Sequence, residues 1–214
     1  MTIIFPRPLP AVTGIESSRF GLTFNTILFE SPINRVAQTL KRPGSLWSGQ
    51  YKLPPVTGAA ARQWKAWLVS MQGPAGAFLG FDPDHRLPDG SASSATSTPL
   101  VQGASQSGTS IVTDGWAPNV TGLLLPGDYI QIGNVGTAIQ LKIVTEQVDS
   151  DLLGQATINF EAALHKSPAD NAPVIFANPV GVFRLEDNAA AAWEADRVGS
   201  HGFSFSFIEV PEVT

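Results

Sequence analysis

Side chains that commonly carry chemistry are sparse in this 214-residue sequence. It has three histidines and no cysteine, and the lack of cysteine excludes disulfide scaffolds, cysteine-ligated zinc, iron–sulfur clusters and thiol nucleophiles. The densest group of metal-donor side chains is Asp82, Asp84 and His85. Prolines at 83 and 88 mark a tight turn there, and aspartates in such turns bond their own backbone. We therefore expect a turn and no metal site at this position.

Other short motifs are also incomplete. Asp149 and Asp151, followed by Gly154, resemble the start of a calcium loop but lack the later ligands and the closing glutamate. We expect a solvated hairpin turn there. Residues 103–108 (GASQSG) do not match the nucleophile motif G-x-S-x-G, and no phosphate-binding glycine loop follows a strand. No local feature marks two carboxylates as a glycosidase pair. We therefore expect a protein that is not an enzyme and has no cofactor.

Charge is low and unevenly distributed. Only 14% of residues are charged, against about 25% in an average soluble protein, which fits a subunit covered by its neighbours. Residues 1–89 hold nine Lys/Arg and five Asp/Glu, whereas residues 90–214 hold four and thirteen. Clustered basic residues, which a nucleic-acid reader needs, are absent apart from the pair Lys41 and Arg42. The asymmetry permits contact between oppositely charged faces of neighbouring subunits.

No apolar run approaches the ~20 residues of a membrane span, and the first residues lack the pattern of a secretion signal. We therefore expect no membrane insertion, and synthesis in a cytoplasm.

The N-terminal part is expected to form strands and then one helix. Alternating apolar residues predict strands over 20–29, 36–40 and 47–53. A helix is predicted over about 59–72, with Thr57 as a possible cap and Gly73 at its end. Its tryptophans, Trp64 and Trp67, share one apolar stripe with Leu68 and Met71. Paired indoles can stack on sugars or bases, but the shared stripe favours a core position.

The rest of the chain alternates between two patterns. Residues 91–99 are rich in Ser, Thr and Ala and predict a linker. Short period-two segments at 110–112, 127–133, 139–143 and 156–160 predict a small β-barrel of the oligonucleotide/oligosaccharide-binding (OB) type. Strands are then expected at 180–185, around Trp193, and at 203–210, although 189–195 also has helical propensity.

The last strand decides the predicted domain organisation. Phe203, Phe205 and Phe207 point to one face and the intervening serines to the other. A single terminal strand needs partners, and the strands before residue 90 are the obvious ones. The predicted fold is therefore mainly β: a discontinuous, β-sandwich-like domain with one α-helix, formed by 1–95 and 173–214, and an inserted β-barrel at 98–170.

The order of several short motifs resembles the distal tail proteins of long-tailed bacteriophages and gene transfer agents. The motifs span nearly the whole chain; they are residues 5–8 (FPRP), 42–47 (RPGSLW), 53–55 (LPP), the tryptophan helix, 81–83 (FDP), 114–116 (DGW), 125–133 (LPGDYIQIG), 183–185 (FRL) and 205–209 (FSFIE). The resemblance implies a structural virion protein at the tail tip. It also implies a hexameric ring that joins the tail tube protein to the baseplate hub protein and leaves a lumen for DNA.

Two other functions stay open. One is a carbohydrate-binding module in which Trp116 and Tyr129 of the barrel stack on a host surface glycan. The other is a tail-tube or other minor tail protein, which shares the virion location. The single small insertion leaves little room for a long host-binding arm.

Overall fold

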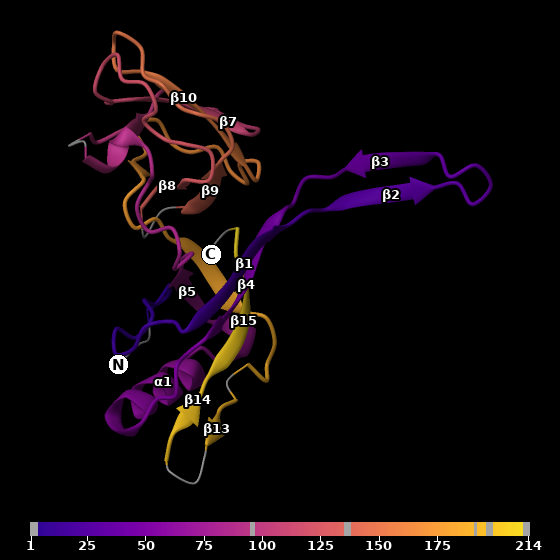
Figure 1. Cartoon of the computed structure of the whole chain (residues 1–214), viewed down its shortest axis with the longest axis vertical. Helices are drawn as coiled ribbons and strands as arrows, with labels where there is room; N and C mark the ends of the chain where they lie inside the picture. Colours follow the sequence, from indigo (N-terminus) through magenta and orange to yellow (C-terminus); the bar gives the residue numbers. More distant parts are fainter. Residues whose placement is uncertain (1–3, 95–96, 135–137, 191, 196–198, 212–214) are drawn as a thin grey trace.

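The computed structural model describes residues 4–94, 97–134, 138–190, 192–195 and 199–211. The fold is mainly β, with one α-helix in these ranges (Figure 1). The predicted ends of the discontinuous domain at 1–3, 95 and 212–214, and positions 95–96 of the predicted linker, lie outside the described residues.

A five-stranded antiparallel sheet is built from both ends of the chain. Its strand order is β1 (Ser17–Thr23), β4 (Leu46–Lys52), β15 (Ser204–Glu209), β12 (Gly181–Leu185) and β5 (Ala77–Gly80). The C-terminal strand therefore lies between a strand from the first quarter of the chain and β12, with Phe205 opposite Tyr51 and Phe207 opposite Gly49. At Gly49 the close approach of Phe207 requires glycine, because a Cβ there would lie 2.6 Å from that ring.

The helix α1 (Gly58–Ser70) covers one face of this sheet. Its buried residues are Ala61, Trp64, Trp67 and Leu68, which confirms the predicted apolar stripe. Thr57 is the N-cap residue, but its side chain makes no capping hydrogen bond. The chain leaves the helix through Gln72 and Gly73, both at positive φ, and continues into the short 3₁₀ helix η1 (Gly73–Ala75).

A second, six-stranded sheet is barrel-like and nearly closed. Its strand order is β11 (Val174–Ile175), β8 (Tyr129–Ile132), β9 (Gln140–Val144), β10 (Ala156–Glu161), β7 (Ser110–Asp114) and β6 (Leu100–Val101). The two edges meet where Leu100 forms a bridge with Pro173 and the Val101 N–H donates to the Ala172 carbonyl oxygen at 2.9 Å.

Two predicted boundaries differ from the structure. Residues 91–94 form the 3₁₀ helix η2 (Ser91–Ser94), where the Ala92 N–H donates to the Leu123 carbonyl oxygen and the Ala92 side chain is buried in the barrel core. This segment was expected to be a linker; instead the Ser91 N–H also donates to the Gly122 carbonyl oxygen at 2.8 Å, which holds the segment against 122–123. At the other end, Val174 pairs with β8 and belongs to the barrel core, not to the five-stranded sheet.

Two small hairpins complete the fold. Strand β13 (Glu194–Ala195) pairs with β14 (His201–Gly202) directly after Trp193, as expected for a strand there. Just before it, residues 188–190 form a turn in which the Ala192 N–H donates to the Ala189 carbonyl oxygen at 3.1 Å. Strands β2 (Thr26–Glu30) and β3 (Ala37–Lys41) pair with each other and project away from both sheets (Figure 1). In the described ranges no helix has the length and apolar character that a membrane span requires.

Candidate functional site

The β2–β3 hairpin has two chemically different faces. In an antiparallel pair, residues opposite each other share a face, and so do residues two apart along a strand. Ile27 lies opposite Leu40 and Phe29 opposite Gln38, and the Ser31 N–H donates to the Val36 carbonyl oxygen just beyond the strands. One face therefore carries Ile27, Phe29, Ser31, Val36, Gln38 and Leu40, of which four are apolar; the other carries Thr26, Leu28, Glu30, Ala37, Thr39 and Lys41.

The apolar face of the hairpin is open to solvent. Phe29 and Val36 are each 57% exposed, and Leu40 is 47% exposed. At the tip, Ile33 is 94% exposed. A contiguous set of exposed large apolar side chains on one element indicates an interaction surface, whereas single exposed ones do not.

The base of the hairpin is held to the barrel. The Lys41 ammonium lies 3.3 Å from the Glu161 carboxylate at the end of β10. Across the base, the Asn25 side-chain amide donates to the Pro43 carbonyl oxygen at 3.0 Å, and the Arg42 N–H donates to the Asn25 carbonyl oxygen at 3.0 Å. The base of the hairpin is thus closed by its own hydrogen bonds and contacts the barrel through one exposed ion pair.

An apolar groove lies on the opposite side of the five-stranded sheet from the hairpin. The N-terminal segment runs along the outer edge of β5, where the Arg7 N–H donates to the Ala77 carbonyl oxygen at 2.9 Å, and β5 and the hairpin lie on opposite sides of β1 (Figure 1). The groove has a volume of about 450 Å³, and its lining includes Pro8, Leu9, Ile15, Leu79, Phe81 and Pro83. We call it the N-terminal groove.

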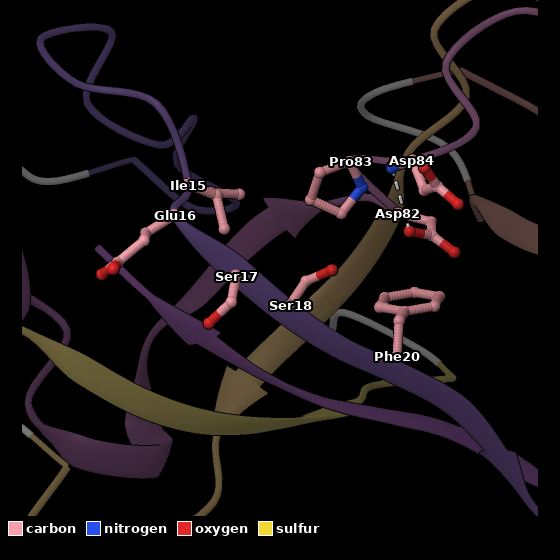
Figure 2. A pocket seen from close by; sticks show the side chains of 8 residues that line it. All are labelled: Ile15, Glu16, Ser17, Ser18, Phe20, Asp82, Pro83 and Asp84. Carbon is pink, nitrogen blue, oxygen red and sulfur yellow. Dashed lines mark hydrogen bonds between the residues drawn. The ribbon is translucent and has the colours of Figure 1, made fainter. Parts of the chain in front are cut away.

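An acidic depression adjoins the N-terminal groove and shares Ile15 and Pro83 with it. Figure 2 shows the depression between the start of β1 and the 82–84 loop, with Phe20 at one end and the carboxylates of Glu16, Asp82 and Asp84 around it. The Asp82 carboxylate accepts from the Asp84 N–H at 3.2 Å, which is the predicted turn contact, and from the Tyr129 hydroxyl at 3.0 Å. Asp84 has 84% of its side chain exposed.

The five residues predicted for the core, Trp64, Trp67, Phe203, Phe205 and Phe207, are all buried and lie in one cluster. The Trp64 indole N–H donates to the Thr13 hydroxyl at 2.9 Å, and that of Trp67 donates to the Pro8 carbonyl oxygen at 2.9 Å. The tryptophans therefore bind the N-terminal segment as well as the sheet.

The two residues predicted for glycan stacking lie apart in different environments. Trp116 is 4% exposed, stacks on Phe176 at a centroid distance of 5.6 Å, and donates its indole N–H to the Thr113 hydroxyl. Stacking on a sugar needs an open aromatic face, so the expectation for Trp116 is corrected by its burial. Tyr129 is half-buried between the two sheets, with its ring centroid 5.6 Å from that of Trp47. Burial, and then the nearby Asp82 carboxylate, raise the pKa of the Tyr129 hydroxyl.

Buried polar contacts of Trp47 and Glu209 join the five-stranded sheet to the barrel. The Trp47 indole N–H donates to the Leu141 carbonyl oxygen of β9 at 2.8 Å, and the Trp47 backbone N–H donates to the Glu209 carboxylate at 3.0 Å. The same carboxylate lies 3.7 Å from the His165 imidazole. Lys142 is fully buried and donates to the Ala163 carbonyl oxygen at 3.0 Å. Burial lowers its pKa to about 8, against the opposing influence of Glu209 and Glu161.

The remaining candidate residues for chemistry make turn contacts. Asp151 accepts from the N–H groups of Leu153 and Gln155, each at 2.8 Å, which confirms the predicted turn. Within the described residues, no three His, Cys, Asp or Glu side chains are grouped in a way that could hold a metal ion. The described residues thus present a projecting hairpin with exposed apolar side chains and a separate apolar groove.

In comparisons with known proteins, no family model and no curated sequence matches this chain.

The sequence predicted one strand over 20–29 and another over 36–40. The structure divides the first into β1 and β2, and the separation of β2 and β3 from the body of the protein was not predicted. Four apolar residues alternate toward one face on both sides of the 31–35 turn, and this pattern was the available signal. Periodicity identifies an apolar face without saying whether the same chain covers it.

Proposed function

We propose that this protein is a structural adaptor of a phage tail tip that assembles, through its β2–β3 hairpin, into a ring joining the tail tube protein to the baseplate hub protein. The observation that carries the proposal is the apolar hairpin face, which has no partner among the described residues of its own chain. The sequence resemblance to distal tail proteins supplies the location, the two neighbouring proteins and the number of six subunits.

The hairpin face supports assembly on energetic grounds. A two-stranded hairpin alone is marginally stable in water and normally needs a third strand or a packed face. Burying a Val, Leu, Ile or Phe side chain contributes about 1.5–3 kcal/mol. Phe29, Val36 and Leu40 are about half exposed and Ile27 is partly buried, so covering these four side chains contributes on the order of 3–6 kcal/mol, before the association costs are subtracted. A neighbouring subunit that covered this face would therefore stabilise both the hairpin and the assembly.

The placement of the hairpin supports a ring. It continues from the ends of β1 and β4 away from the body of the protein (Figure 1). In this proposal it contacts a different surface of the neighbour, so the contact is heterologous. Heterologous contacts close into rings when the rotation between neighbours allows it. In this proposal the hairpin of one copy packs beside the sheet of the next and completes the sandwich-like ring domain. The barrel-like sheet, in an OB-type arrangement, projects from the ring.

The charge of the chain supports a lumen for DNA. The formal net charge is −5, and a conduit that releases its cargo must not neutralise many phosphates, because each such contact adds to binding. The protein would be made in the bacterial host cytoplasm and reside in the virion.

The test is the mass of the purified protein in solution, measured by mass photometry over a range of concentrations, with negative-stain electron microscopy of the same samples. We expect closed rings of six copies. The variant Phe29→Ser, on the apolar face, should shift the population toward monomers. Leu28→Ser is the matched control, because Leu28 is 60% exposed on the opposite face of the same strand.

A protein that stays monomeric at all concentrations would refute the proposal. If that monomer also bound glycan through Tyr129, the carbohydrate-binding function would replace it. An assembly that responds equally to Phe29→Ser and Leu28→Ser would show that the apolar face is not the contact.

A further inference from the structure

The tip of the hairpin carries one apolar side chain and one cation. Ile33 is 94% exposed, and Arg35, two residues further on, is exposed and has no carboxylate partner among the described residues. The tip is ordered by local hydrogen bonds: the Arg35 N–H donates to the Ser31 carbonyl oxygen at 2.9 Å, and the Val36 N–H donates to the Asn34 side chain at 3.2 Å. Ile33 and Arg35 therefore lie two residues apart on one hydrogen-bonded turn.

The N-terminal groove and the acidic depression are complementary to the hairpin tip, the groove to Ile33 and the depression to Arg35. The groove has mostly apolar lining and a volume of about 450 Å³, large enough for an isoleucine side chain. Its cation, Arg86, is already engaged, with the guanidinium 3.7 Å above the Phe81 ring and a hydrogen bond to the Pro179 carbonyl oxygen. At the adjoining depression the exposed carboxylate of Asp84 has only His85 within ion-pair distance among the described residues.

We propose that the hairpin tip of one copy docks in the N-terminal groove of the next copy, with Ile33 in the apolar groove and Arg35 at the Asp84 carboxylate. This inference rests on the proposed function and names the surface that receives the hairpin. The occupant is a second copy because the tip matches the site in both respects: one apolar side chain for an apolar groove, and an unpaired cation for an exposed anion.

The positions of the two surfaces agree with this contact. The hairpin continues from the ends of β1 and β4, whereas the N-terminal segment lies along the outer edge of β5 (Figure 1). A tip that binds a groove on the far side of the next copy leaves that copy's own hairpin free for a third. The contact therefore propagates from copy to copy, as a ring requires.

Charge reversal tests the electrostatic half of the contact. Arg35→Glu and Asp84→Arg should each raise the concentration at which assemblies half dissociate by about tenfold, because each places like charges opposite each other. The double variant should return to within about threefold of the original protein, because the ion pair is restored with its signs exchanged. Glu146→Arg, an exposed carboxylate on the barrel, is the control and should change nothing.

Cysteine cross-linking tests the apolar half, and the natural chain has no cysteine to interfere. Ile33→Cys combined with Ala11→Cys, an exposed position in the groove lining, should give a ladder of disulfide-linked species on non-reducing gels. Leu28→Cys with Ala11→Cys should give none.

The outcomes separate this inference from the proposed function. Rings that form normally but show neither the charge effect nor the Ile33–Ala11 cross-link would overturn the docking site and leave the adaptor function standing. A chain that never assembles would overturn both.

Discussion

Trp64 is predicted to be the largest single contributor that α1 makes to stability. Its side chain is 1% exposed. Its indole lies 5.7 Å from that of Trp67 and 6.2 Å from the Phe205 ring, and it donates to the Thr13 hydroxyl. Replacing it with alanine removes contacts with the helix, the sheet and the N-terminal segment together.

The expected cost of Trp64→Ala is about 3–5 kcal/mol, the range for truncating a buried aromatic residue. At about 2–4 °C per kcal/mol for a chain of this size, the melting temperature should fall by about 6–20 °C. Trp64→Phe keeps most of the packing and loses the hydrogen bond to Thr13, which is worth about 0.5–1.5 kcal/mol. It should therefore lie much closer to the original protein.

Urea unfolding followed by far-ultraviolet circular dichroism measures these differences without depending on tryptophan fluorescence. Trp193→Ala is the matched control, because Trp193 is 40% exposed and its main contact is a cation–π interaction with Lys65 at 4.9 Å, worth about 0.5–1 kcal/mol at an exposed site. If Trp64→Ala cost no more than Trp193→Ala, the placement of α1 against the sheet would be refuted.

Three further predictions concern the sheets. Gly49→Ala should destabilise the protein by about 1–3 kcal/mol in urea unfolding, because the added Cβ meets Phe207. Between about pH 7.5 and about pH 9.5 the free energy of unfolding should rise by about 2 kcal/mol because of Lys142: in the folded state its ammonium loses a proton near pH 8, whereas the unfolded chain keeps this proton to about pH 10.5. In Lys142→Met this rise should disappear. An unchanged rise would contradict the lowered pKa of Lys142. Asp128→Ala should cost about 3 kcal/mol in thermal unfolding, because it leaves the N–H groups of Asp89, Gly90 and Leu125 without their acceptor.

Strong periodicity made the main elements predictable. The helix was expected over 59–72 and runs over Gly58–Ser70, because its apolar residues repeat at helical spacing. The strand at Ser204–Glu209 followed from the alternation of phenylalanine and serine. That it pairs with a strand from before residue 90 followed from the need of a terminal strand for partners; which strand, β4, the structure supplies. The repeat of each pattern is long enough to exclude the other secondary structure.

Tertiary contacts decided what the sequence could not predict. The segment 91–94 has the composition of a linker, yet Ala92 is buried in the barrel core. The preceding Gly90 packs directly on the backbone of Leu123 and Leu124, and the Ala92 N–H donates to the Leu123 carbonyl oxygen. Trp116 is a large aromatic residue of the kind that stacks on sugars, yet Phe176, sixty residues away in sequence, stacks on it and covers it. Neither contact leaves a local signal, because both partners are distant along the chain.

The attachment of the middle of the chain has a consequence for how such proteins can diversify. Strands β5 and β12 are neighbours, and Gly80, the last residue before the chain leaves the five-stranded sheet, lies opposite Gly181, the first residue on its return. The two ends of everything between them are thus separated by one inter-strand spacing, about 5 Å. Segments of very different length and shape can be exchanged at this point while the strand order beneath them is retained, so what the protein displays can evolve independently of how it holds together.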